Sequence, residues 1–349
     1  MDRLFRLCGP IETPQERSHE TKVRRSTDGG ITWLVPQVLV RNDPLLPLRL
    51  PSVAAHDDQA YVTMTRFVSS RLQYFMMVSS NGGETWDSVR QITFVPESHG
   101  LGNIFVTAIS VHLVFERAVQ PSGKEIAYMV STNKGITWSD EQVLSTVDTY
   151  QAWNPNVAAD GAGNVYISWQ DAKYGSIGGF AGIVLLRRST DNGQSWLSEI
   201  RITPVPAANG SSVALSGSYV HVGFGDERDG FQDATARYKI STDGGGTWCD
   251  EIVLGGPLRR ALSPSVGSTP DRVYASGPQT DPRQATPPTS SCVSERSSRV
   301  LLRTIRCTLK PSQFHCPIRI PSICTPIFAI GCTNEDMYGF LSLIFSAGV

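Results

Sequence analysis

The chain alternates between short runs rich in β-branched and aromatic residues and turns rich in Gly, Pro and Asp. Between residues 51 and 254 the runs come in groups of four, and each run has the length of a strand rather than a helix. The groups span residues 51–93, 98–145, 151–203 and 209–254. No segment shows the periodicity of an amphipathic helix. The pattern therefore predicts an all-β protein made of four-stranded antiparallel sheets.

An eight-residue phrase follows the third run of each group. It reads STDGGITW at 26–33, SSNGGETW at 79–86, STNKGITW at 131–138, STDNGQSW at 189–196 and STDGGGTW at 241–248. Its five Trp residues are 53, 52, 58 and 52 residues apart. A period near 52 residues, with one aromatic and glycine motif per four strands, predicts a β-propeller in which each group is one blade.

The phrase has the composition of a tight turn between the third and fourth strands. Its Asp or Asn can accept hydrogen bonds from backbone N–H groups, its fifth residue is a Gly that tolerates positive φ, and its Trp can pack on the sheet. We therefore expect a structural role for the Asp, Asn and Trp positions. These are Asp28, Trp33, Asn81, Trp86, Asn133, Trp138, Asp191, Trp196, Asp243 and Trp248.

The phrase S-x-D-x-G-x-T-W resembles the Asp-box, or BNR repeat, of sialidases, and the resemblance covers residues 22–254. It implies a six-bladed propeller with the boxes on the face opposite the active site. It also implies a glycoside hydrolase of the exo-alpha-sialidase type that acts on terminal anionic sugars. Because other propellers carry the same boxes, two alternatives stay open. One is a non-catalytic propeller that binds glycan or protein on its rim face, and the other is an inactive, truncated relative.

The number of blades differs between counting and resemblance. Residues 22–40 supply a third and a fourth strand, and residues 263–276 supply a first and a second strand, so joining these halves gives five blades. The expected organisation is an N-terminal extension at 1–21, a propeller at 22–279 and an irregular Pro-, Ser- and Cys-rich tail at 280–349. That tail is read either as a disulfide-linked module or as a degenerate last blade, and its odd cysteines give no clean pairing.

Charged residues return where the second strand of each group ends. They are Arg66, Arg117, Asp171, and Asp226 with Arg228. If strands alternate in direction, these ends lie on the face away from the phrases, which we call the rim face. Three arginines there could bind a carboxylate through paired hydrogen bonds. The alternative is that they tie neighbouring blades together by ion pairs.

The resemblance also implies catalytic roles, because sialidases use an Asp as acid and base, a Tyr nucleophile activated by a Glu, and an arginine triad. Asp226 and Asp171 are the acid candidates, Tyr150 is the nucleophile candidate, and Trp153 is a candidate for stacking on a sugar. Arg49, in LRLPS, resembles the Arg-Ile-Pro motif of sialidases, although it follows the first phrase instead of preceding it. No clear Tyr/Glu pair is visible, and the last blade is incomplete.

Composition and charge argue against several classes of partner and cofactor. The formal net charge is −1 and charged residues make up 18% of the chain, which argues against nucleic acid as a partner. No apolar run is long enough for a membrane span or, near the N-terminus, for a signal peptide, although members of the family are often secreted. No zinc-type Cys/His spacing or phosphate-binding glycine loop occurs, so no metal or cofactor is expected. The expected partner is a glycan or glycoconjugate, while the compartment and oligomeric state are not indicated.

Overall fold

The computed structural model describes residues 4–8, 20–41, 49–177, 181–230, 234–254, 264–269 and 272–276, and short strands at 298–299, 303–305 and 330–331. All regular structure in these residues is β, and every strand pair is antiparallel. The all-β prediction is confirmed. Within this part of the chain no helix is long and apolar enough to cross a membrane.

Four complete four-stranded sheets follow one another along the chain, as the pattern predicts. Sheet 2 consists of β4 (Arg49–His56), β5 (Gln59–Val68), β6 (Arg71–Ser79) and β7 (Arg90–Gln91). Sheet 3 consists of β8 (His99–Val106), β9 (Val111–Arg117), β10 (Glu125–Ser131) and β11 (Gln142–Val143). Sheet 4 consists of β12 (Ala152–Ala159), β13 (Val165–Asp171), β14 (Ile183–Ser189) and β15 (Ile200–Arg201). Sheet 5 consists of β16 (Ala208–Ser216), β17 (Tyr219–Asp226), β18 (Thr235–Ser241) and β19 (Ile252–Val253).

The sheets before and after these four have three strands each. Sheet 1 consists of β1 (Leu4–Cys8), β2 (Glu20–Ser26) and β3 (Gln37–Arg41). The strand pattern did not predict β1, which pairs with β2 from within the expected N-terminal extension. Sheet 6 consists of β20 (Ser265–Thr269), β21 (Arg272–Ser276) and β23 (Arg303–Ile305), and β22 (Ser298–Arg299) pairs with β24 (Ile330–Gly331). The number of blades in a closed ring stays a prediction, because most of the tail at 280–349 lies outside the described residues.

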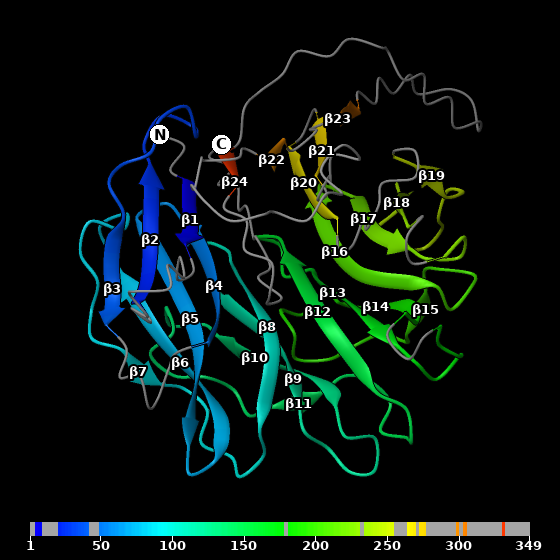
Figure 1. Ribbon diagram of the computed structural model, residues 1–349, viewed down its shortest axis with the longest axis horizontal. Helices are drawn as coiled ribbons and strands as arrows, with labels where there is room; N and C mark the ends of the chain where they lie inside the picture. Colours follow the sequence, from blue (N-terminus) through cyan, green and yellow to red (C-terminus); the bar gives the residue numbers. More distant parts are fainter. Residues whose placement is uncertain are drawn as a thin grey trace, which may run out of the picture.

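The sheets are arranged around a common centre, with the first strands of sheets 2 to 5 innermost and the short strands β7, β11, β15 and β19 farther out (Figure 1). Neighbouring inner strands touch, β4 against β8, β8 against β12, β12 against β16 and β16 against β20. Side-chain oxygens bridge these strands: Ser52 accepts the N–H of Ile104 at 3.4 Å, and Asn156 accepts that of Val213 at 3.2 Å. The inner strands are thus tied to one another by polar contacts as well as by packing.

The hydrophobic core lies between neighbouring sheets rather than inside one. One cluster joins Tyr61 and Met76 of sheet 2 to Leu113 and Phe115 of sheet 3. Equivalent clusters join sheet 3 to sheet 4 around Trp169, and sheet 4 to sheet 5 around Phe224. Because each sheet needs its neighbours to bury both faces, the repeats stabilise one another.

The five eight-residue turns share one hydrogen-bond pattern. The first Ser accepts the N–H of the fifth residue, a Gly, at 2.8–2.9 Å in each turn. The third residue accepts the N–H of the seventh at 2.8–2.9 Å. Hydrogen bonds from that seventh residue are the largest cause that lowers the pKa of Asp28, Asp191 and Asp243 to about 2. The turn role inferred from the phrase agrees with this geometry.

The four turns of sheets 2 to 5 are also fixed to the sheet before them. Arg25 donates to the carbonyl of Gly82 at 3.0 Å, and Arg188 donates to that of Gly244 at 2.8 Å. Arg90 and Gln142 make the same contact to the carbonyls of Gly135 and Gly193. A glycine in the turn therefore leaves its carbonyl open to a long side chain from the neighbouring sheet, and this contact is a repeated link across the seam.

The turn glycines differ in how closely the neighbouring sheet packs against them, and this difference tests the packing between sheets. Gly193 (φ +85°) lies against Tyr128 of sheet 3, and a Cβ there would meet the Tyr128 hydroxyl at 2.2 Å. Gly245 (φ +91°) has its nearest neighbour, a Tyr166 ring carbon, at 3.6 Å. We expect Gly245→Ala to lose about 1–2 kcal/mol of unfolding free energy through positive φ, and Gly193→Ala to lose at least about 1 kcal/mol more through overpacking. Urea denaturation of both variants measures this, and equal losses would contradict the close seam at Gly193.

Two buried histidines predict an acid-sensitive core. The Nδ1 atoms of His112 and His221 lie 2.7 and 2.6 Å from the hydroxyls of Tyr128 and Tyr238, and their Nε2 atoms have no hydrogen-bond partner within the described residues. Burial lowers the pKa of each histidine to about 4. The unfolded chain therefore binds these protons first as the pH falls, so stability is lost between about pH 6.5 and pH 4, on the order of 3 kcal/mol per histidine.

Unfolding free energies measured from pH 4 to pH 7 should show this slope in the wild type. We expect the slope to become shallower in His112→Gln and in His221→Gln. His56 is the matched control, because its side chain is 31% exposed. A slope that His112→Gln and His56→Gln change equally would refute the assignment.

Candidate functional site

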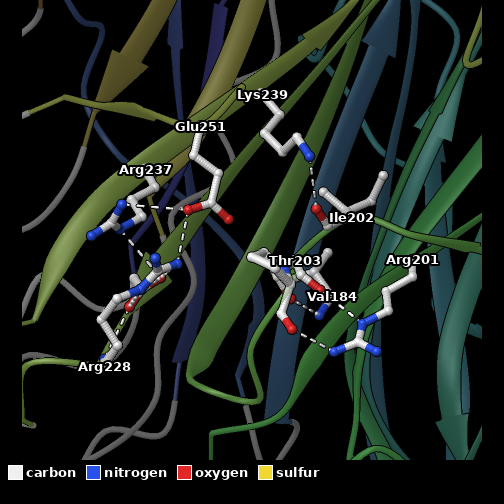
Figure 2. Close-up of polar contacts among 10 residues, drawn as sticks. Val184, Arg201, Ile202, Thr203, Arg228, Arg237, Lys239 and Glu251 are labelled. Atoms are coloured by element: carbon white, nitrogen blue, oxygen red, sulfur yellow. Dashed lines mark hydrogen bonds and ion pairs between the residues drawn. The ribbon is translucent and has the colours of Figure 1, made fainter. Parts of the chain in front are cut away.

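The end of β17 carries a closed group of four charges on sheet 5 (Figure 2). The buried carboxylate of Asp226 accepts hydrogen bonds from Arg228 and lies 3.2 Å from Nε of Arg237. Glu251 completes the group, with Oε2 2.8 Å from Arg228 Nη2 and 3.4 Å from Arg237 Nη1. The hydrogen bond with Asp226 is the largest cause that raises the pKa of Arg228. Two cations and two anions balance, so the group is already neutral.

Sheet 3 repeats this arrangement at the end of β9. Arg117 lies 3.2 Å from a carboxylate oxygen of Glu97 and 3.3 Å from one of Glu141. The Nε2 atom of His99 lies 3.0 Å from Oε1 of Glu141. The side chain of Arg117 is therefore engaged by two acids.

On sheet 4 the basic residue is a lysine. Lys173 follows β13 and lies 2.7 Å from Glu199, which directly precedes β15. In sheets 3, 4 and 5 an acid before the fourth strand thus pairs with a base at or just after the end of the second strand. One interpretation of the sequence was that these charges tie neighbouring blades together by ion pairs. That is wrong for these three bases, because Arg117–Glu141, Lys173–Glu199 and Arg228–Glu251 each join strands of a single sheet.

Cations of the third strands instead join neighbouring sheets through backbone carbonyls. Lys239 of β18 donates to the carbonyl of Ile202 in sheet 4 at 3.1 Å, as Figure 2 shows. Arg187 of β14 makes the same contact to the carbonyl of Leu144 at 2.8 Å. No ion pair of either cation is found among the described residues, and both hold neighbouring sheets side by side.

Arg66 differs from the other two rim arginines. It lies in β5 with a half-exposed side chain, and within the described residues no ion pair of Arg66 is found. To bind a ligand carboxylate by two parallel hydrogen bonds, an arginine needs guanidinium N–H groups that are not already bonded to acids of the protein. Of the three arginines expected to act together, Arg66 is therefore the one whose guanidinium no acid holds in the part of the chain that the structure describes.

Asp171 closes β13 and is 2% exposed. It accepts hydrogen bonds from the Trp169 indole at 3.1 Å and from the Lys173 backbone N–H at 2.9 Å. Burial is the main cause that raises the pKa of Asp171, and it outweighs these hydrogen bonds. A carboxyl in this environment holds its proton to a higher pH than a surface Asp.

The aromatic candidates lie on either side of the start of sheet 4. Tyr150 is half-exposed in the connection before β12, and its N–H donates to Asp148 at 2.6 Å. The sequence placed Trp153 in that connection as well, but it belongs to inner strand β12, where it pairs with Gln170. Arg49 is the first residue of β4 and pairs with Thr65. A register shift follows Arg49, as one follows Trp153 in β12. The side chain of Arg49 lies outside the described residues. The candidates thus occupy four different sheets and one connection, and among those whose side chains are described, Asp226 and Arg228 are in direct contact.

The acids of the charged groups were missed in the sequence, although a signal for them exists. Glu141, Glu199 and Glu251 each stand three residues after the Trp of a repeated phrase. The same regularity is absent after Trp33 and Trp86. Within the described residues no three His, Cys, Asp or Glu side chains are placed to hold a metal ion.

No family model matches the sequence, and no curated protein is similar to it at a significant level. Solved structures share its fold. A Hadza microbial sialidase, Hz136, has a TM-score of 0.55 at 16% identity, over 74% of this chain and 57% of that one. The NanB sialidase of Streptococcus pneumoniae has a TM-score of 0.55 at 11% identity, over 81% and 66%. A protein of unknown function from Dyadobacter fermentans has a TM-score of 0.57 at 14% identity, over 78% and 83%.

This likeness shows a sialidase-like β-propeller fold. The chain spans less than two thirds of the length of either sialidase. At identities of 11–16% the comparisons concern architecture alone.

The charged group of sheet 5 predicts a difference between two arginines. Removing Arg237 leaves the buried Asp226 with one cation fewer, so Arg237→Leu should lower the free energy of unfolding by about 2–4 kcal/mol. Arg66→Leu is the control, because no ion pair is found for Arg66 in the described part of the chain, and its cost should stay within about 0.5 kcal/mol. Chemical denaturation at neutral pH compares them, and similar costs would show that the group does not depend on Arg237.

Proposed function

We propose that the protein is a sialidase-like glycoside hydrolase of the exo-alpha-sialidase type, acting on terminal anionic sugars of glycans or glycoconjugates. The fold likeness to sialidases supports the class of protein. Its reaction and substrate are the proposal.

The observation that carries the proposal is the buried carboxyl of Asp171. Hydrolysis of a glycosidic bond needs an acid that keeps its proton until it donates it to the leaving oxygen. Burial raises the pKa of Asp171 in the required direction. Asp171 stands at the end of β13, close in sequence to the loop that carries Lys173 and the exposed Tyr174.

The other roles follow from exposure and charge. Arg66, which has no ion pair among the described residues, is proposed to receive the sugar carboxylate, and Arg117 and Arg228 to contribute their positive field. Tyr150 is the proposed nucleophile because its side chain is half-exposed, and Trp153 is proposed to stack on the sugar ring. Asp226, held by two arginines, is the second acid candidate.

The alternative is a non-catalytic propeller that binds glycan on its rim face. One observation favours it: Arg117 and Arg228 already have carboxylate partners, so a substrate would have to compete with Glu97, Glu141 and Glu251. An arginine triad with one open member binds a carboxylate more weakly than one with three.

Release of a fluorophore from an α-linked sialoside tests the proposal, with a neutral galactoside as the control substrate. Asp171→Asn should lower kcat/KM for the sialoside at least about 100-fold, the usual range for loss of a general acid. The matched control is Asp140→Asn. Asp140 is an exposed Asp two residues after Trp138, and its replacement should leave turnover unchanged.

Turnover of the sialoside that survives in Asp171→Asn would overturn the assigned acid. Saturable binding of the sialoside without turnover, in protein shown to be folded by thermal denaturation, would replace the hydrolase with the binding propeller. If neither binding nor turnover is seen, anionic sugars are not the ligand.

A further inference from the structure

A second buried carboxyl, Glu125, lies at the start of β10, on the sheet next to that of Asp171. Its side chain is fully buried. Ser145 Oγ contacts Oε2 and also accepts the N–H of Ile126 at 2.8 Å. Oε1 is buried and has no hydrogen-bond partner within the described residues. Burial raises the pKa of Glu125, and it outweighs the hydroxyls of Ser145 and Ser122, which favour the ionised form.

The cations around Glu125 are already bound by other acids. Arg117, directly opposite in β9, lies against Glu97 and Glu141. Lys124, the preceding residue, lies 3.0 Å from Glu116. Lys173, beyond the connection to sheet 4, lies against Glu199 and donates to Thr146.

The remaining charged neighbours of Glu125 are negative. After burial, the influences that raise its pKa are the charges of Asp171 in β13 and of Asp148 in the connection between sheets 3 and 4. The same connection carries Tyr150, whose N–H is bonded to Asp148. The backbone links the two buried carboxyls across the seam: the carbonyl of Lys124 accepts the N–H of Ala152 at 3.1 Å, and Ala152 is the strand partner of Asp171.

We propose that Glu125 is a positioning residue that keeps its proton at neutral pH, across the seam from Asp171. A neutral Glu125 fills the buried position without adding a charge. Asp171 can then donate and recover a proton without an added negative charge from Glu125 in the seam between sheets 3 and 4. The role of Asp171 rests on the proposed function, whereas the proton on Glu125 does not.

The coupling should be visible without any substrate. In protein labelled at the side-chain carboxyl carbons of Asp and Glu, the NMR signal lost in Glu125→Gln identifies Glu125, and its pH titration gives the midpoint. We expect that midpoint above those of exposed glutamates such as Glu84, and we expect Asp171→Asn to lower it by at least about half a pH unit, because a neighbouring like charge is removed.

Stability gives a second readout. A carboxyl whose folded pKa is raised loses stability as the pH rises through the window between its unfolded and folded values. Above that window wild type carries the penalty of an ionised Glu125, and Glu125→Gln does not. Glu125→Gln should therefore unfold at a higher temperature than wild type at alkaline pH, with a smaller gain near pH 4, while Glu84→Gln should follow wild type throughout.

Each experimental outcome tests one part of the proposal. A Glu125 signal that titrates with the exposed glutamates would overturn the proposed proton on Glu125. A raised midpoint that Asp171→Asn leaves unchanged would overturn the coupling to Asp171. If both NMR results hold and the sialoside is not hydrolysed, the proposed function fails while the proton on Glu125 stands.

Discussion

The contact on which the ring of sheets depends is the hydrogen bond from a long side chain to a glycine carbonyl of the next eight-residue turn. Arg25, Arg90, Gln142 and Arg188 make it at four successive seams. The contact requires a turn whose backbone is rigid and whose glycines leave room, and the bonds from the first Ser and the third residue supply that rigidity. Because the hydrophobic clusters also lie between sheets, errors in a turn would misplace the packing of two sheets at once.

A second constraint acts on the rim face, where charges must be paired before they can be buried. Burying an isolated ion costs several kcal/mol, so the structure surrounds Asp226 with two arginines and Arg117 with two glutamates. The pairs stabilise the strand ends and at the same time reduce what these arginines can offer a ligand. Asp171 and Glu125 have no paired arginine within the described residues, and burial there raises the pKa of both. Pairing thus separates the structural charges from those suited to proton transfer.

Particular residues show how far local sequence can go towards a site. The phrase with its Trp and the three-residue step to Glu141, Glu199 and Glu251 would have identified the acids that bind the rim bases. Trp153 was expected in the connection that precedes the first strand of its group, yet β12 includes it, with a register shift between Trp153 and Asn156. A bulge depends on the strand next to it, and the sequence of one strand does not reveal it.

By itself, the sequence determined the all-β class, the four-stranded units and the turn chemistry, because strand length, turn residues and the repeat period are local properties. It also marked the strand ends that carry charge. Only the tertiary structure decided which of those charges are paired, since Arg117 and Glu141, or Arg228 and Glu251, meet through the order of strands in a sheet. The burial of Glu125 beside the sheet of Asp171 was likewise settled by how two sheets pack, and desolvation, which sets the protonation of such groups, is a property of that packing.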